Sequence, residues 1–184
     1  MALKSTVFRA DLQVSDMDRN YYANHTLTLA QHPSETDERM MVRLLAFALN
    51  AHEHLAFGNG LSTDDEPDLW RKDLTGAIET WIDVGMPDEK LIRRACGRAN
   101  HVCIYAYGGR VVEMWWHGVA GKLGRCDNLS VYDVSTATTR TLAQLVERNM
   151  HLQCNIQDGE VWFGSDQQTV KLERKELKAM VIHG

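Results

Sequence analysis

The sequence predicts an α+β fold with a mixed central β-sheet flanked by helices, and three observations lead to this prediction. Residues 5–13 and 25–30 alternate apolar and polar side chains, as half-buried strands do. Residues 35–53 instead repeat apolar side chains at helical spacing. The middle of the chain then has a strand, a helix and a strand in succession, an order that favours parallel pairing of the two strands.

The N-terminal third is predicted to hold two strands and a helix. The polar stretch 15–24 connects the strands at 5–13 and 25–30. Ser34 is a suitable N-cap for the helix at 35–53, and acidic residues crowd its first turn, where the helix dipole favours them.

The remaining elements follow from the same patterns. A short strand is expected at 55–58, a hairpin at 68–84, a helix from Asp88 to Ala99 and an apolar strand at 101–108, with 78–84 and 102–107 parallel. The C-terminal third is predicted as strands at 111–117 and 128–134, a helix at 136–149 and a hairpin that turns at Asp158-Gly159.

Size and composition indicate one domain over residues 1–184. The chain is 44% hydrophobic and 24% charged, which are ordinary values for globular proteins. A formal net charge of −5 argues against non-specific binding of nucleic acid over the whole surface, although a local basic groove is compatible with it. We find no secretory signal and no segment that could span a membrane. With four widely spaced cysteines, these features predict a cytoplasmic protein with reduced thiols.

The hairpin at 68–84 contains the most informative pair of residues. If Thr75-Gly76 is a two-residue turn, positions that sum to 151 face each other across the two strands. The facing pairs are then Leu74–Ala77, Lys72–Glu79, Trp70–Trp81 and Asp68–Asp83. Two opposed carboxylates repel each other, so the pair predicts a bound divalent cation. The expected ion is Mg²⁺, and Mn²⁺ could substitute for it. A longer loop would shift this register.

The element order around this hairpin resembles the core of the PD-(D/E)XK nuclease fold, the restriction-endonuclease-like core. In that chemistry two acidic residues hold Mg²⁺ and a lysine two positions after the second acts on the attacking water. Asp68 and Asp83 occupy the acidic positions, but Gly85 occupies the lysine position. Lys90, in the first turn of the next helix, is the first substitute for that lysine, and Lys72 is the second.

Two further acidic residues are candidates for the same site. Glu66 is a candidate third metal ligand, with a solvated acidic loop as the alternative explanation. Glu38, on the first helix, is a candidate water-positioning carboxylate. Its alternative role is to complement the helix dipole or to pair with Arg39 or Arg43.

The predicted helix from Asp88 to Ala99 is a candidate surface for DNA or RNA, or for a protein partner. Arg93, Arg94 and Arg98 suit phosphate contacts, and a solvated helix face is the competing explanation. Trp70 and Trp81 suit either base stacking or cross-strand packing.

The chain resembles the YaeQ family of bacterial proteins. The resemblance rests on five blocks that span nearly the whole chain: 27-LTLAQHPSETDERMMVRLLAF-47, 63-TDDEPDLW-70, 78-IETWIDVGMPDEKLIRRAC-96, 128-NLSVYDV-134 and 150-MHLQCNIQDGEVWF-163. The resemblance implies a variation on the PD-(D/E)XK fold that is decorated with extra β-hairpins. It implies no substrate and no reaction.

Three hypotheses remain open from the sequence. The first is a metal-dependent nuclease in which Asp68 and Asp83 hold Mg²⁺. The second is a catalytically inactive nuclease scaffold that binds nucleic acid or protein, which Gly85 favours. The third is a structural interaction protein with no affinity for metal or nucleic acid.

Overall fold

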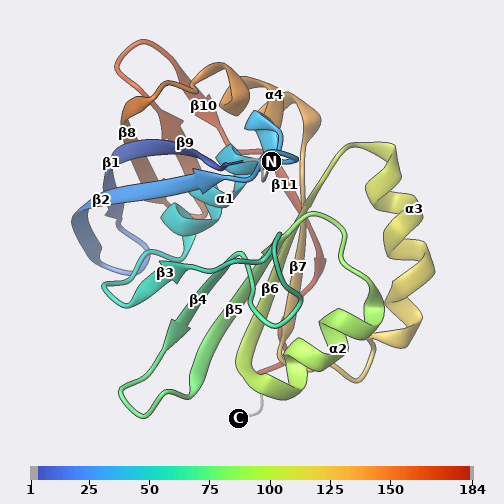
Figure 1. The fold of residues 1–184 in the computed structure, drawn as a ribbon. Helices are drawn as coiled ribbons and strands as arrows, with labels where there is room; N and C mark the ends of the chain where they lie inside the picture. The colour runs from blue at the N-terminus through green and yellow to red at the C-terminus, as the bar shows by residue number, and fades with distance from the viewer. Residues whose placement is uncertain (1–3, 183–184) are drawn as a thin grey trace. The chain divides into compact units, whose positions relative to one another are not determined.

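A computed structural model describes residues 4–182, and the chain divides into two compact units (Figure 1). Unit 1 is formed by residues 1–51 and 137–173, and unit 2 by residues 52–136 and 174–184. Each unit is therefore assembled from separate stretches of sequence. No single position divides the chain into two consecutive domains, and one domain over 1–184 stays a prediction.

Unit 1 contains a five-stranded mixed sheet with the strand order β10-β9-β8-β1-β2. Strands β1 and β8 are parallel, and the other neighbours are antiparallel. The elements are β1 (Thr6–Asp16), β2 (Tyr21–Gln31), α1 (Asp37–Leu49), β8 (Asn149–Gln157), β9 (Glu160–Gly164) and β10 (Thr169–Lys171), with most of α4 (Thr136–Gln144). Helix α1 is the apolar centre of this unit, since Met40 to Ala48 are all buried.

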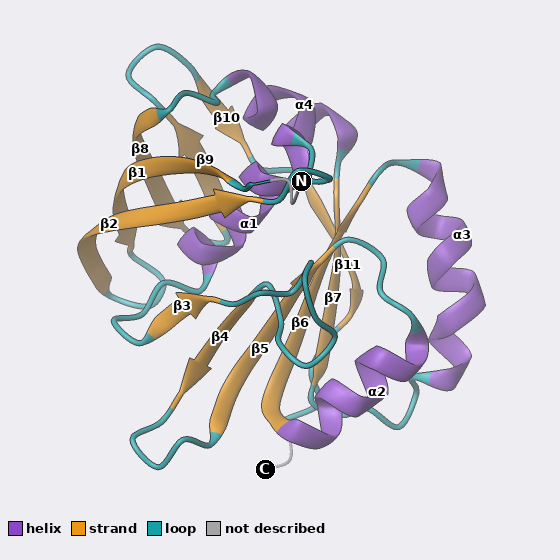
Figure 2. Cartoon of the chain, viewed as in Figure 1, coloured by secondary structure: helices purple, strands orange, loops and turns teal. Residues whose placement is uncertain are grey.

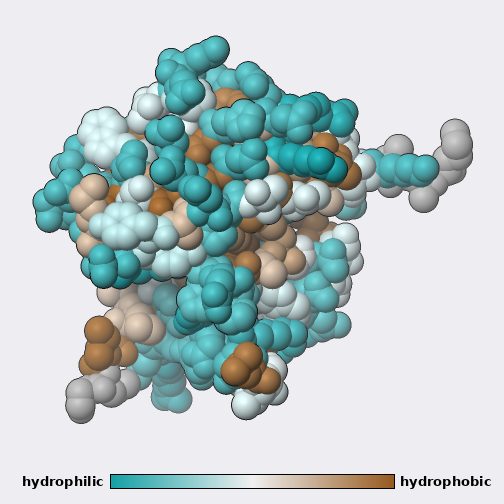
Figure 3. All heavy atoms as spheres, turned by 90° about the vertical axis from the view of Figure 1, so that its left-hand side faces the viewer, coloured by the Kyte–Doolittle hydropathy of each residue, from teal (hydrophilic) through white to brown (hydrophobic). Residues whose placement is uncertain are grey.

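The sheet of unit 1 has one apolar and one polar face. Side chains of β8 alternate strictly between exposed and buried, and those of β1 nearly so, as period 2 requires. Seen from the side on which β1 and β2 lie in Figure 1, the surface is mostly hydrophilic (Figure 3).

Unit 2 contains a six-stranded mixed sheet with the strand order β11-β7-β6-β5-β4-β3. The strands are β3 (Leu55–Phe57), β4 (Leu69–Lys72), β5 (Ile78–Val84), β6 (Ala99–Tyr107), β7 (Leu129–Val134) and β11 (Arg174–Lys178). The helices are α2 (Glu89–Arg98), α3 (Arg110–Val119) and the 3₁₀ helix η1 (Ala120–Lys122). Strands β5, β6 and β7 are parallel, so the predicted parallel pairing of 78–84 with 102–107 is confirmed.

Helices α2 and α3 lie on one side of this sheet (Figure 2). The core beneath them is formed by buried apolar side chains of α2, β5, β6 and β7, among them Trp81, Ile92 and Ile104. The α+β class is confirmed, but the chain has two mixed sheets rather than one central sheet.

The predicted strand at 111–117 is wrong, because this segment forms α3. Val112, Trp115, Trp116 and Val119 recur every three or four residues, which is a helical period. The β-branched and aromatic content of the segment obscured that period. Tertiary packing of this stripe against the core of unit 2 overrides strand propensity.

The helix that was predicted at 35–53 exists but is shorter. Thr36, and not Ser34, is its N-cap: the Thr36 hydroxyl accepts a hydrogen bond from Arg39 N at 3.1 Å. Ser34 Oγ instead bonds His32 Nδ1 at 2.7 Å. Ser34 and Thr36 are both residue types that cap helices well, so the sequence alone does not decide between them.

Some of the strands and turns near the N-terminus and the C-terminus were predicted correctly, and others were not. Strands β1 and β2 extend into the stretch 15–24 that was expected to be a connection, which leaves a short turn after Asp16. The hairpin turn at Asp158-Gly159 is confirmed, with positive φ at both residues. Strands β10 and β11 were not predicted. Within residues 4–182, no helix is long and apolar enough to cross a membrane.

Candidate functional site

The β4–β5 hairpin of unit 2 positions the two candidate metal ligands. Asp68 directly precedes β4, and Asp83 is the penultimate residue of β5. Trp70 faces Trp81 as predicted, with the two rings edge to face and their centroids 6.0 Å apart. The register expected near the open end of the hairpin is therefore correct.

The turn of this hairpin differs from the prediction. The loop is longer than two residues: Asp73 N donates to Ala77 O, and the Asp73 carboxylate accepts from Thr75 and Ala77. These hydrogen bonds, the Thr75 side chain first, hold the pKa of Asp73 below its usual value. A register shift after Arg71 places Lys72 opposite Ile78, so the Lys72–Glu79 pair is wrong. The change of register is confined to the loop side of Arg71. Trp70 therefore stays opposite Trp81.

Asp68 and Asp83 are neighbours, and the carboxylate of each accepts a hydrogen bond from a main-chain amide of the segment that carries the other. Asp83 Oδ1 accepts from Asp68 N at 3.3 Å, and Asp68 Oδ2 accepts from Val84 N at 2.8 Å. Asp83 Oδ2 also accepts from Trp81 Nε1 at 2.9 Å. The two carboxylates thus stand beside each other at the end of β5, oriented by main-chain and indole donors.

A glycine loop covers the Asp68 carboxylate. Gly58 N donates to Asp68 O at 2.9 Å, which extends the β3–β4 pairing. A Cβ added at Gly60 would lie 2.8 Å from both Asp68 N and Asp68 Oδ1. Only glycine therefore allows this loop to approach so closely, and Asp68 is 3% exposed as a result. Sequence reasoning missed Gly60, although the Gly-Asn-Gly sequence at 58–60 was a visible signal for close backbone approach.

Gly85, at the lysine position of the nuclease motif, has a structural role. Its φ is 107°, a conformation that residues with a side chain rarely adopt. Gly85 N donates to Tyr105 O at 2.9 Å and extends the pairing of β5 with β6. A lysine at this position would strain the backbone, so the difference from the motif is built into the local fold.

Two of the other predicted site residues have hydrogen-bond partners of their own, and the third is exposed. Glu66 Oε2 accepts from Asn59 N at 2.9 Å. Lys90 is exposed on the first turn of α2. Glu38 belongs to unit 1, where its carboxylate accepts a short hydrogen bond from the Thr139 hydroxyl.

The donor set suits Mg²⁺ better than a metal that needs a complete protein cage. Within residues 4–182, no group of three or more His, Cys, Asp or Glu side chains is arranged to hold a metal ion. Mg²⁺, however, is commonly bound by one or two carboxylates and keeps several waters. Asp68 and Asp83 would supply two such carboxylates, and a Mg²⁺ ion at this pair, with Glu66 as third ligand, stays a prediction.

Basic and aromatic side chains meet next to the hairpin. The Arg98 guanidinium lies 5.0 Å from the Trp81 ring centroid and donates to Asp65 O at 3.1 Å. Lys72 Nζ lies 3.9 Å from the Trp70 ring centroid. The predicted tryptophan pair is therefore packed, and each ring has a cation against it.

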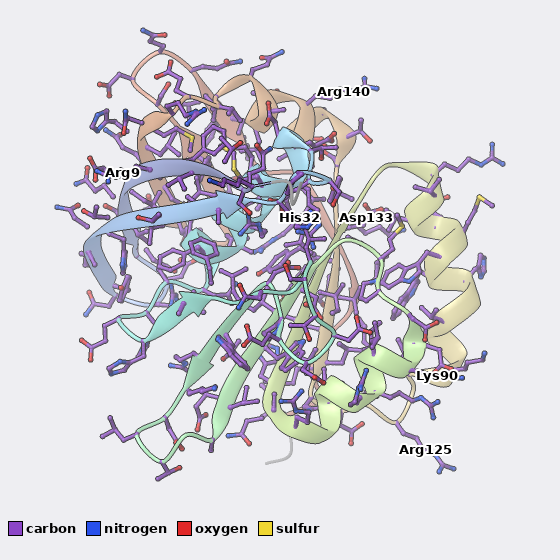
Figure 4. All side chains as sticks on the ribbon, viewed as in Figure 1. Arg9, His32, Lys90, Arg125, Asp133 and Arg140 are labelled. Carbon is purple, nitrogen blue, oxygen red and sulfur yellow. The ribbon has the colours of Figure 1, made fainter. Side chains whose placement is uncertain are left out.

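The outer face of α2 is basic. Arg93 pairs with Glu89 at 2.7 Å, while Lys90 and Arg94 are exposed. Arg125, on the connection after η1, projects outward as well (Figure 4). A chain of net charge −5 thus carries a local group of cations on unit 2.

A further acidic residue, Asp133, lies on β7. In the sheet, β6 separates β7 from β5, and the three strands are parallel. Burial, and then the nearby Glu113 carboxylate, raise the pKa of Asp133, while Lys175 opposes them. Asp133 is the penultimate residue of β7, as Asp83 is of β5. Sequence reasoning missed it, although an acid at the carboxyl end of a parallel strand is a common site signal.

Comparisons with known proteins agree along nearly the whole chain. Residues 1–174 match the family described as YaeQ protein. The chain is 41% identical over 173 residues to a protein of Salmonella typhi named "Uncharacterized protein YaeQ", covering 94% of this chain and 96% of that protein. It is 41% identical over 172 residues to the Escherichia coli K12 protein of the same name, covering 94% and 95%.

Two solved structures share the fold. The crystal structure of YaeQ from Xanthomonas axonopodis pv. citri is 54% identical, with a TM-score of 0.91 and coverage of 95% of this chain and 99% of that one. The crystal structure of YaeQ from Pseudomonas syringae is 34% identical, with a TM-score of 0.91 and coverage of 95% and 97%. With sequence and fold in agreement over nearly its full length, the chain belongs to the YaeQ family.

Proposed function

We propose that this chain is a Mg²⁺-dependent phosphodiesterase that acts on nucleic acid and has a PD-(D/E)XK-like core in unit 2. The single observation that carries the proposal is the hydrogen bonding of Asp68 and Asp83 at the end of β5: Asp83 Oδ1 accepts from Asp68 N, and Asp68 Oδ2 accepts from Val84 N, the residue after Asp83. The element order β3, β4, β5, α2, β6 within unit 2 supports it, because these elements follow one another in the same order in that nuclease core. Helix α1, which precedes them in the chain, belongs to unit 1.

Each residue has a distinct role in this proposal. Asp68 and Asp83 hold the cation, and the backbone and indole donors fix their orientation. When bound, Mg²⁺ would supply Lewis acidity at a phosphoryl oxygen. Lys90 offsets negative charge at the scissile phosphate, in place of the lysine that the conformation of Gly85 disfavours. The contribution of Glu38 stays a prediction.

Thermal unfolding with and without Mg²⁺ tests the site first. A cation that binds only the folded chain stabilises it by about 1.4 kcal/mol at tenfold its dissociation constant. We expect this gain in the wild type and not in Asp83→Asn. Asp64→Asn, which removes an exposed loop carboxylate, is the matched control and should keep the gain. Equal gains in the wild type and Asp83→Asn would rule out this metal site.

Activity is then measured on fluorescent single-stranded and double-stranded DNA and RNA. We expect cleavage that requires Mg²⁺ or Mn²⁺, is abolished in Asp83→Asn and is reduced in Lys90→Ala. Metal-dependent stabilisation without cleavage of any substrate would separate the cation site from the reaction and disprove the phosphodiesterase.

A second function, metal-independent binding of nucleic acid, is favoured by the exposed cations of α2 and by Gly85. Lys90 and Arg94 are exposed on this helix, and phosphate contacts need such cations. This function predicts binding that persists in EDTA, weakens with salt and falls in Arg94→Ala. Arg9→Ala, an exposed arginine on β1 in unit 1, should leave binding unchanged.

A further inference from the structure

Two of the four free cysteines come together in unit 2. Cys96 lies in the last turn of α2, and Cys126 lies on the connection between η1 and β7. Both are half-buried and pack against the same apolar core. The other two, Cys103 and Cys154, are 2% and 0% exposed. The chain therefore holds one accessible pair of thiols and two inaccessible single thiols.

Hydrogen bonds fix the Cys126 connection onto the end of α2. The Asn128 side chain donates to Cys96 O and to Ala99 O, both at 2.9 Å. Cys126 N donates to Leu123 O at 3.0 Å. Asn128, two residues after Cys126, thus holds the connection against the turn of helix that carries Cys96.

The two thiols are close enough to control each other's ionisation. Burial, and then the charge and hydrogen bonding of the neighbouring Cys126 thiol, raise the pKa of Cys96 to about 12, while Lys178 acts in the opposite direction. The two side chains are therefore near enough to influence each other, as two thiols that form a disulfide must be.

The surface beside the pair is open. A Cβ added at Gly97 would meet nothing within 4 Å, and one at Gly124 would meet only Gly121 O, at 4.0 Å. These glycines are close in sequence to Cys96 and Cys126. Cys96 and Cys126 are themselves only half-buried, so a small oxidant can approach the pair, and the backbone at Gly97, next to Cys96, is not packed against a neighbour that would resist adjustment.

We propose that Cys96 and Cys126 form a peroxide-reactive dithiol that closes to an intramolecular disulfide. The Cys126 thiolate attacks one oxygen of hydrogen peroxide, which forms a sulfenic acid on Cys126 and releases hydroxide. Cys96 sulfur then attacks the Cys126 sulfur, the S–S bond forms and the sulfenic oxygen leaves as water. In total, two thiols and one peroxide give one disulfide and two waters, with the thiols oxidised and the peroxide reduced.

The test counts free thiols in the wild-type protein after hydrogen peroxide, by alkylation in denaturant and peptide mass spectrometry. We expect the four thiols to fall to two, a crosslink between the Cys96 and Cys126 peptides, monomers on a non-reducing gel, and recovery of all four with dithiothreitol. Cys103 and Cys154 in the same sample are the internal controls and should stay alkylated. This experiment requires no variant to fold.

Two variants then assign the roles. In Cys96→Ser, a sulfenic acid should accumulate on Cys126 and be trapped by dimedone, with no loss of a second thiol. In Cys126→Ser, Cys96 should react at least about tenfold more slowly, because a thiol of raised pKa is poorly nucleophilic. Four remaining thiols in the wild type, a crosslink between chains, or a crosslink to Cys103 or Cys154 would each overturn the proposal.

Discussion

Asp68 is a buried carboxylate, and its contribution to the stability of the fold can be measured separately from any role in binding a cation. It is 3% exposed, and its Oδ2 satisfies the amide of Val84. We predict that Asp68→Ala lowers the free energy of unfolding by about 2 kcal/mol, since a buried donor is left without its acceptor. Asp68→Asn keeps a carbonyl oxygen and should cost less.

Chemical denaturation in EDTA measures this loss without any contribution from a cation. Glu66→Ala is the matched control, because Glu66 accepts from Asn59 N in a more exposed loop. If Asp68→Ala and Glu66→Ala were equally mild, the hydrogen bond to Val84 would not be a structural requirement.

We predict that His101 makes the stability of the fold depend on pH. Burial lowers the pKa of His101 below its usual value, and the ring lies 3.0 Å from Ser130 Oγ. Because the unfolded chain then binds the proton more readily, this contribution to stability is complete above about pH 6.5 and is lost as the pH falls. Burial lowers the pKa of His25 in the same direction.

Denaturation curves between pH 7.5 and pH 5.5 measure this dependence. We expect stability to fall with decreasing pH, and to fall less steeply in His101→Gln. His54→Gln, which removes an exposed histidine, should follow the wild type. A slope that His101→Gln leaves unchanged would assign the dependence to other groups.

At the scale of a single element, the start of α1 allows a test, because the sequence offers two residues, Ser34 and Thr36, that could be the N-cap. Thr36 accepts from Arg39 N, whereas Ser34 bonds His32. We predict that Thr36→Ala lowers the free energy of unfolding by about 1 kcal/mol, and that Ser34→Ala lowers it by less. Thermal unfolding of the two variants side by side decides between them. The reverse order would show that Ser34 caps the helix in solution.

Elements with a single dominant pattern were predictable, and those with two competing patterns were not. Alternation identified β1 and β2, and Asp88 was correctly predicted as the cap of α2. In α3, strand propensity and helical period point to different structures. In the β4–β5 hairpin, the tryptophan pair was predictable, but the Asp73 loop and the bulge after Arg71 were not.

At the scale of the whole molecule, the C-terminal segment returns to complete the sheet of unit 2. Strand β11 pairs with β7, and Leu177 packs against the core of that unit. We predict that a chain ending at Glu173 loses protection of β7 from amide hydrogen exchange, because it exposes the edge of that strand. A chain ending at Lys178 keeps β11 and is the control. Unchanged exchange in β7 of the shorter chain would contradict this.

The sequence by itself determined the α+β class, the order of elements from α1 to β6, the facing of Trp70 and Trp81, and the approach of Asp68 to Asp83. These follow from local periodicity and strand register, which are properties of neighbouring residues. Only the tertiary structure decided that there are two sheets, that α3 is a helix, that Gly60 closes over Asp68 and that Cys96 meets Cys126. Each of these depends on packing between residues distant in sequence. A local pattern can suggest such a feature, as the glycines at 58–60 and the helical spacing of α3 do, but only the packing decides between the alternatives.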